Sequence, residues 1–193
     1  MLDLATARRA LRTHSPVEVN EPGTFPAAVA VILIEGPEGL EVLFIERAQR
    51  EGDPWSGQIA FPGGRRDPGD QDLAATAIRE AREETGVELA SAERLGQLDD
   101  MYPRTPVLPP VVVRPFVFAL PTRPEITPSS DEVRTGFWVP LASLLAPGVH
   151  QVVTVSPRGM TLSVSAYLVG RNVIWGMTER ILTPFLGLVS EFR

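Results

Sequence analysis

The chain has 193 residues, 44% of them hydrophobic, and a formal net charge of −6 at pH 7. This length and hydrophobic content suffice for one buried core, so we expect a single domain over residues 1–193. The absence of cysteine excludes disulfides, thiolate catalysis and cysteine-based metal sites, and the acidic charge balance gives no reason to expect a nucleic-acid partner.

The first 26 residues predict a short helix followed by an extended connector. Leu4–Leu11 is amphipathic, and the Ser15-Pro16 step ends the pattern because the residue before a proline disfavours helical geometry. Three arginines interrupt the apolar positions, so the segment differs from a signal peptide. No later run approaches the roughly 20 apolar residues of a membrane span. We therefore expect a cytoplasmic protein without a membrane partner.

The next elements indicate a sheet and one long helix. Two apolar runs, Ala27–Ile34 and Glu41–Glu46, predict strands joined by a glycine- and proline-containing turn. Leu73–Thr85 has a helical pattern that ends at Gly86, where a C-terminal glycine is common. The remaining predictions are strands at Glu93–Leu98, Val111–Leu120 and Thr135–Val139, a hairpin over Val149–Val169, a closing helix over Met177–Phe192, and rigid proline-rich loops at 103–110 and 121–128.

Three glutamates of the long predicted helix suggest a metal site. At about 100° per residue, Glu80, Glu83 and Glu84 share one narrow stripe. Like charges three or four positions apart repel each other, whereas a divalent cation reverses the sign because Mg²⁺ combines carboxylates with waters and substrate phosphates. The alternative interpretation is an acidic face exposed to solvent.

The residues around these glutamates favour the metal-site interpretation. Phe61-Pro62-Gly63-Gly64 predicts a turn in which the backbone can approach a ligand closely. Arg79 lies four positions before Glu83, so it can pair with that carboxylate or orient Glu80.

The segment from Gly64 to Val87 resembles the Nudix box, whose general form is G-x5-E-x7-R-E-U-x-E-E-x-G-U with U apolar. Here it is Gly64-x5-Asp70-x8-Arg79-Glu80-Ala81-x-Glu83-Glu84-x-Gly86-Val87. Asp70 replaces the usual first glutamate, and the interval to Arg79 is one residue longer than in the general pattern. These two departures occur together in the coenzyme A diphosphatase group of the family.

Two further segments are similar to that group. Arg47-Ala48 followed by Gly57–Gly64 resembles its upstream signature, and Ile174–Thr178 resembles a segment near its C-terminus. The interval between Arg47 and Gly57 is one residue longer than in the group's pattern, and Arg50 is the nearest counterpart of its second arginine. The resemblance therefore extends from Ala28 to about Leu182.

The resemblance implies the Nudix fold, an α/β (α+β) arrangement in which a mixed β-sheet is sandwiched between helices. It also implies a site that binds Mg²⁺ or Mn²⁺. The metal ligands would be Glu80, Glu83, Glu84 and the Gly64 carbonyl. Glu80 would be the first choice for the general base and Glu132 the second, and Arg79 would orient the carboxylates. The substrate-binding residues would be Arg47, Arg50, Arg65 and Phe61.

The expected reaction is hydrolysis of the diphosphate bond of coenzyme A or its derivatives, giving 3′,5′-ADP and 4′-phosphopantetheine. Two alternatives stay open: a Nudix hydrolase of another substrate, such as ADP-ribose or a nucleoside triphosphate, and a non-catalytic Nudix-fold ligand sensor. The three retained glutamates argue against a sensor. The expected partners are a small-molecule nucleotide substrate and, as an option, a second copy of the chain in a homodimer.

Overall fold

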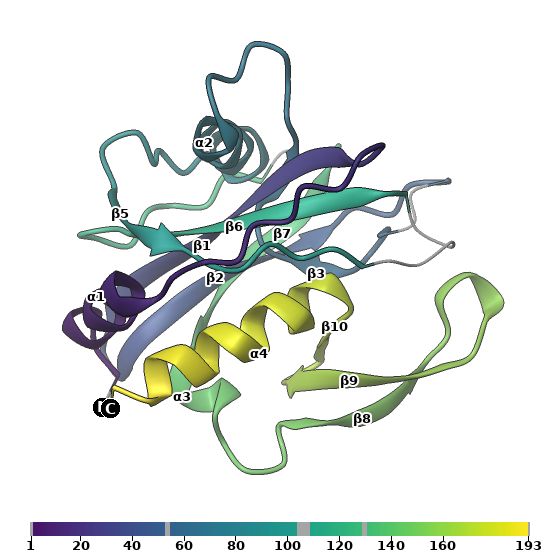
Figure 1. The fold of residues 1–193 in the computed structure, drawn as a ribbon. Helices are drawn as coiled ribbons and strands as arrows, with labels where there is room; N and C mark the ends of the chain where they lie inside the picture. The colour runs from purple at the N-terminus through teal and green to yellow at the C-terminus, as the bar shows by residue number, and fades with distance from the viewer. Residues whose placement is uncertain (1, 53–54, 104–108, 129–130, 193) are drawn as a thin grey trace.

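The computed structural model describes residues 2–52, 55–103, 109–128 and 131–192 (Figure 1). Its helices are α1 (Leu4–Thr13), α2 (Leu73–Thr85), α3 (Leu141–Leu144) and α4 (Met177–Ser190), with a 3₁₀ turn at Pro157–Gly159. Its strands are β1 (Phe25–Gly36), β2 (Gly39–Arg47), β3 (Ile59–Ala60), β4 (Gly63–Arg65), β5 (Glu93–Gln97), β6 (Val111–Ala119), β7 (Val133–Pro140), β8 (His150–Val155), β9 (Leu162–Val169) and β10 (Asn172–Trp175).

The predicted long helix is confirmed at both ends. Asp72 caps the start of α2, where its carboxylate accepts a hydrogen bond from the Ala75 N–H at 2.8 Å. Gly86 ends the helix in the left-handed conformation, with φ of 73°, and its N–H donates to the Arg82 carbonyl at 2.9 Å. These caps fix the length of α2 and thereby the position of its glutamates.

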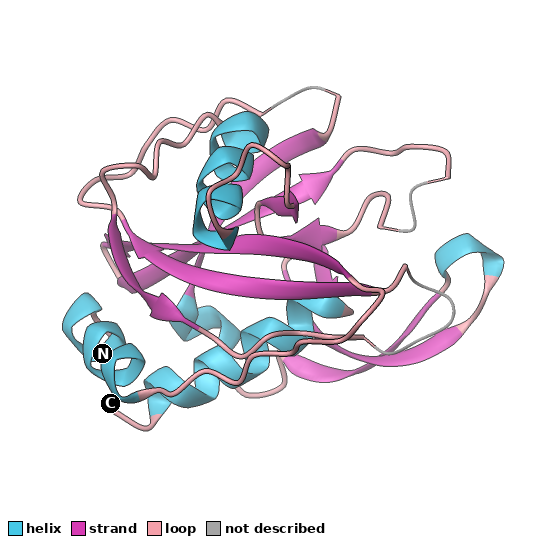
Figure 2. Ribbon diagram, turned by 45° about the horizontal axis from the view of Figure 1, so that its top comes forward, coloured by secondary structure: helices cyan, strands magenta, loops and turns pink. Residues whose placement is uncertain are grey.

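A seven-stranded mixed sheet forms the centre of the fold. Its order is β3-β2-β1-β6-β5, with β4 also paired to β1 and β7 to β2; β1 and β6 are parallel and the other pairs are antiparallel. Helix α2 covers one face, and α1 and α4 cover the other (Figures 1 and 2). The predicted sheet between helices is confirmed.

Alternation along β1 explains why both faces of this sheet are buried. Ala30 and Ile32 belong to the apolar cluster that includes Ala77 of α2, whereas Val31 belongs to the cluster that includes Phe185 of α4. Successive side chains of a strand point to opposite faces, so one apolar run supplies both cores. The run Ala27–Ile34 is continuously apolar in the sequence because both faces of β1 are buried.

The second sheet and the shortest strands differ from the predictions. The hairpin predicted over Val149–Val169 contains β8 and β9, and β10 extends it to a separate three-stranded sheet, ordered β10-β9-β8. The predicted turn at Phe61–Gly64 is partly wrong, because Gly63–Arg65 forms β4 and pairs with β1. Helix α3 was not predicted either. Elements of two to four residues carry too little periodicity to be recognised in the sequence.

Two other expectations concern loops and membranes. Much of the predicted loop at 103–110 lies outside the described residues. Within the described part of the chain, no helix is long and apolar enough to cross a membrane.

Candidate active site

A cavity of about 420 Å³ lies where β1, β4 and β6 meet the last turns of α2 and the first turn of α4. Seven of the residues singled out in the sequence line it: Arg47, Phe61, Gly64, Arg65, Glu80, Glu84 and Glu132. They come from four separate stretches of the chain. The fold therefore brings the Nudix-box residues and the upstream signature to one place.

Glu84 is the most deeply buried acid of this cavity. Its side chain is 2% exposed, and one carboxylate oxygen accepts a hydrogen bond from the Gly63 N–H at 2.8 Å. The other oxygen lies 3.7 Å from Nη1 of Arg47. Burial raises the pKa of Glu84 to about 8, because desolvation outweighs these two contacts. A cation bound next to Glu84 would therefore stabilise the charged form of this carboxylate.

Glu80 lies directly against the backbone of Gly64. A Cβ atom placed on Gly64 would collide with the Glu80 carboxylate, so a larger residue here would displace that carboxylate. Burial raises the pKa of Glu80, although the hydrogen bond from Arg79 opposes that shift. The Glu80 carboxylate and the Gly64 backbone thus form one oxygen-rich wall.

Arg79 links the acids at this end of the site. Its five N–H donors make five hydrogen bonds, of 2.9 to 3.1 Å, to two oxygens of Asp70, one oxygen each of Glu80 and Glu83, and the Arg65 carbonyl. The bonds to Asp70 contribute most to raising the pKa of the Arg79 guanidinium. Arg79 is therefore a permanent cation that fixes the orientation of both glutamates.

Asp70, the residue that departs from the general Nudix box, anchors Arg79. Its side chain is 7% exposed and accepts hydrogen bonds from the Thr76 hydroxyl at 2.8 Å and the Asp67 N–H at 2.9 Å, besides those from Arg79. The Arg79 contact holds the pKa of Asp70 well below its usual range. Asp70 is therefore ionised at neutral pH and pairs with the Arg79 guanidinium through both of its oxygens.

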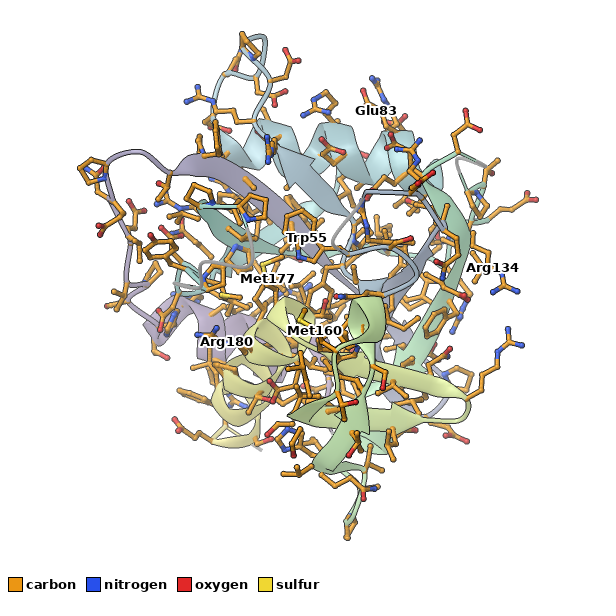
Figure 3. All side chains as sticks on the ribbon, turned by 90° about the vertical axis from the view of Figure 1, so that its right-hand side faces the viewer. Trp55, Glu83, Arg134, Met160, Met177 and Arg180 are labelled. Atoms are coloured by element: carbon orange, nitrogen blue, oxygen red, sulfur yellow. The ribbon has the colours of Figure 1, made fainter. Side chains whose placement is uncertain are left out.

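The single stripe of three glutamates expected from helix geometry divides in the fold. Glu80 and Glu84 line the cavity, whereas Glu83 does not and its side chain is 50% exposed (Figure 3). About 100° of helical rotation separates Glu83 from Glu84, and the sheet covers only one side of α2. The role of Glu83 as a metal ligand stays a prediction.

The remaining predicted residues lie at the rim or in the core. Nη1 of Arg50 lies 3.3 Å from a carboxylate oxygen of Glu132, and both side chains are nearly half exposed. Arg50 itself does not line the cavity. Phe61 lines it but is 3% exposed and stacks on Phe44 at a centroid distance of 5.0 Å, so packing also requires this ring.

The donor set suits a hard divalent cation. Among the residues that the structure describes, no group of three or more His, Cys, Asp or Glu side chains is close enough to hold a metal ion. Mg²⁺, however, commonly uses only one or two carboxylates and completes its coordination with waters and substrate phosphates. Glu80, Glu84 and the Gly64 carbonyl offer oxygen ligands of this kind.

The sequence analysis did not identify the opposite wall of the cavity. Met177, Thr178 and Ile181 of α4 and Val111 and Val113 of β6 line it. Only Met177 and Thr178 carried a signal, because they belong to the segment that resembles the C-terminus of the coenzyme A group. Apolar residues on a buried helix face have no signature that separates a cavity wall from ordinary core.

The chain is similar in sequence to known proteins. The NUDIX domain family profile matches residues 24–157. A Photorhabdus laumondii protein named uncharacterized Nudix hydrolase NudL is 36% identical over 127 residues, covering 66% of each chain. The human protein named mitochondrial coenzyme A diphosphatase NUDT8 is 33% identical over 168 residues, covering 83% of this chain and 68% of that protein.

The fold is also similar to a solved structure. A MutT/nudix family protein from Enterococcus faecalis superimposes with a TM-score of 0.61 at 21% identity, covering 98% of this chain and 70% of that chain. The match to NudL spans just under two thirds of that relative's length. The structural likeness supports the fold, and the local geometry of the cavity supports the chemistry.

Proposed function

Because this chain belongs to the Nudix hydrolase family, we propose that it hydrolyses the diphosphate bond of coenzyme A or its derivatives with the help of a divalent cation. The observation that carries the proposal is the convergence of the buried Glu84 carboxylate, the partly buried Glu80 carboxylate, the Gly64 backbone and the Arg47 guanidinium in one cavity. The identity shared with the human coenzyme A diphosphatase supports the choice of substrate.

Glu80, Glu84 and the Gly64 carbonyl would hold the cation, and Glu83 at the rim is the further candidate ligand. When bound, a divalent cation offsets the charge on diphosphate oxygens and lowers the pKa of a water molecule. Burial raises the pKa of Glu84 to about 8, so binding of a cation beside it would stabilise its charged form. The cavity therefore favours a substrate that arrives with a cation.

The protein's own residues would orient the substrate and accept a proton. Arg47 and Arg65 line the cavity, and their planar guanidinium groups suit phosphate oxygens. A water oxygen attacks one phosphorus, the bond from that phosphorus to the bridging oxygen breaks, and a carboxylate accepts the water's proton. Glu80 is our first choice for this base because Arg79 fixes its position, and Glu132 is the second.

A substrate panel tests this proposal. Coenzyme A, ADP-ribose, NADH, diadenosine polyphosphates and nucleoside triphosphates would each be assayed with Mg²⁺ and with Mn²⁺, and with EDTA as the control. We expect coenzyme A to be preferred, and mass spectrometry after reaction in H₂¹⁸O to find one labelled phosphate among 3′,5′-ADP and 4′-phosphopantetheine. Cleavage of ADP-ribose with a kcat/KM about tenfold above that of coenzyme A would refute the substrate assignment.

Cation binding can be measured without any substrate. A saturating divalent cation should raise the melting temperature, because a ligand at about 100 times its Kd stabilises the folded state by about 2.7 kcal/mol. We expect this increase to disappear in Glu80→Gln and to persist in Glu88→Gln, which changes an exposed carboxylate just after α2. Full activity of EDTA-treated protein would contradict the proposed metal dependence.

A further inference from the structure

Two adjacent arginines at the end of β4 lie on opposite faces of the seven-stranded sheet. Arg65 pairs with Ala27 of β1, which belongs to the apolar cluster on the α4 side, and Arg65 lines the active-site cavity. Arg66 lines a separate cavity together with Phe116, which belongs to the cluster on the α2 side. Because successive side chains of a strand alternate between faces, only the first of the two arginines faces the proposed substrate.

The positive charge of Arg65 is not offset by a carboxylate in the described part of the chain. Nη1 of Arg47 and Nη1 of Arg50, by contrast, lie 3.7 and 3.3 Å from a carboxylate oxygen. The Arg65 guanidinium lies over the ring of Phe25, with Cζ 4.7 Å from the ring centroid. Such a cation–π contact holds a guanidinium in place but leaves its charge and its five N–H donors for an anion.

The contact between Arg65 and Phe25 lies away from the proposed position of the diphosphate. Gly64, whose carbonyl is a candidate metal ligand, pairs with Ala28 of β1. Phe25 comes three positions before Ala28, which corresponds to roughly 10 Å along the strand at about 3.3 Å per residue. The two phosphorus atoms of a diphosphate share one bridging oxygen and lie much closer together than this. The Arg65 guanidinium is therefore placed for a charged group elsewhere on the substrate.

We propose that Arg65 binds a phosphate monoester on the ribose of the substrate and that Phe25 positions the Arg65 guanidinium. The inference rests on the proposed function and deepens it, because coenzyme A carries such a phosphate on its 3′ oxygen. A phosphate monoester has a charge near −2 and three acceptor oxygens, which suit the planar fork of N–H donors. Arg65 then determines substrate specificity, whereas Phe25 acts only through Arg65.

The experiment compares coenzyme A with 3′-dephospho-coenzyme A, using the full chain with Mn²⁺. Both substrates compete in one mixture, so the ratio of their kcat/KM values does not depend on how much protein is folded. Wild type should prefer coenzyme A by about tenfold, the lower range for a hydrogen bond between charged groups, because Phe25 and Arg65 are both exposed. Arg65→Gln keeps an amide donor but no charge, and should bring the ratio to within about twofold of one.

Three further variants separate charge, geometry and position. Arg66→Gln is the matched control, because it removes the same charge from the opposite face of the sheet, and the ratio should stay near the wild-type value. Arg65→Lys keeps the charge without the fork, and should leave a ratio of roughly threefold. Phe25→Leu keeps Arg65 but removes the ring beneath it, and should also leave roughly threefold. A purely structural role of Phe25 would lower kcat/KM for both substrates and leave their ratio unchanged.

Product binding gives a second measurement that does not require turnover. Isothermal titration with Mg²⁺ present would compare 3′,5′-ADP with 5′-AMP, which lacks the 3′-phosphate. Wild type should bind 3′,5′-ADP about tenfold more tightly. This difference should disappear in Arg65→Gln and persist in Arg66→Gln. Equal Kd values in wild type, or no binding of 3′,5′-ADP, would refute the phosphate site.

The outcomes distinguish this inference from the proposed function. If Arg65→Gln lowers kcat/KM for both substrates equally, Arg65 contacts the diphosphate, so the phosphate site is refuted and the hydrolysis of coenzyme A stands. Equal losses of the ratio in Arg65→Gln and Arg66→Gln would indicate a general effect of charge and would also refute the site. Conversely, selective binding of 3′,5′-ADP that depends on Arg65, in a protein that does not cleave coenzyme A, would refute the proposed function and retain the site.

Discussion

Helices α2 and α4 lie on opposite faces of the seven-stranded sheet, yet both line the same cavity (Figure 1). The α2 wall consists of carboxylates whose positions are fixed by Arg79, Asp70 and the backbone of Gly63. The α4 wall consists of Met177, Thr178 and Ile181, held by packing and one hydrogen bond. Charged groups need exact partners and apolar groups need only space, so the two walls should differ in their tolerance of substitution.

The largest effect should come from removing the buried charge of α2. Glu84→Gln should lower kcat/KM by about a thousandfold, the upper range for loss of one group that stabilises charge in the transition state. The glutamine oxygen can still accept the Gly63 N–H, so the melting temperature of the cation-free protein should not fall. Steady-state kinetics and thermal unfolding measure the two effects, and Glu88→Gln is the exposed control.

Two neighbouring glycines should separate folding from catalysis. In Gly64→Ala the new methyl group meets the mobile end of the Glu80 side chain, so activity should fall about a hundredfold with little change in stability. In Gly63→Ala it meets the backbone of Ala28 and Val29, so the free energy of unfolding should fall by about 3 kcal/mol. Kinetics and chemical denaturation of both variants test this contrast, and equal losses of stability would contradict it.

A smaller effect is expected from the anchor of Arg79. Asp70→Asn weakens the contact with Arg79 and should lower the free energy of unfolding at neutral pH by about 2 kcal/mol. Because the folded-state pKa of Asp70 lies below its ordinary value of about 4, its stabilising effect is complete above that pH. That contribution is lost as the pH falls through the folded-state pKa. The free energies of unfolding of wild type and Asp70→Asn, measured by chemical denaturation as a function of pH, should therefore converge below about pH 4. A difference that stays constant with pH would contradict the role assigned to the Asp70 charge.

The smallest effect should come from the polar contact of the α4 wall. Thr178→Val removes the hydrogen bond that the hydroxyl donates to the Ile59 carbonyl at 3.0 Å, at a cost of about 1 kcal/mol. The side chain keeps its volume, so kcat/KM for coenzyme A should change by less than about threefold. A loss comparable to that of Glu84→Gln would make Thr178 part of the catalytic machinery and end the distinction between the walls.

The sequence by itself determined the local features of this protein. The spacing of Glu80, Glu83 and Glu84, the end of α2 at Gly86 and the reach of Arg79 to both glutamates follow from helix geometry over a single turn. The Nudix-box resemblance then identified the fold, because the motif from Gly64 to Val87 includes both the strand and the helix that carry the proposed metal ligands.

Only the tertiary structure decided which acids are buried and what they face. Glu83 and Glu84 are adjacent in sequence, but the sheet covers one and leaves the other at the rim. Asp70 became the anchor of Arg79, and Met177 of α4 came to line the same cavity as Glu84 of α2. Burial depends on segments that are far apart in the chain, and neither composition nor periodicity records which of them will meet.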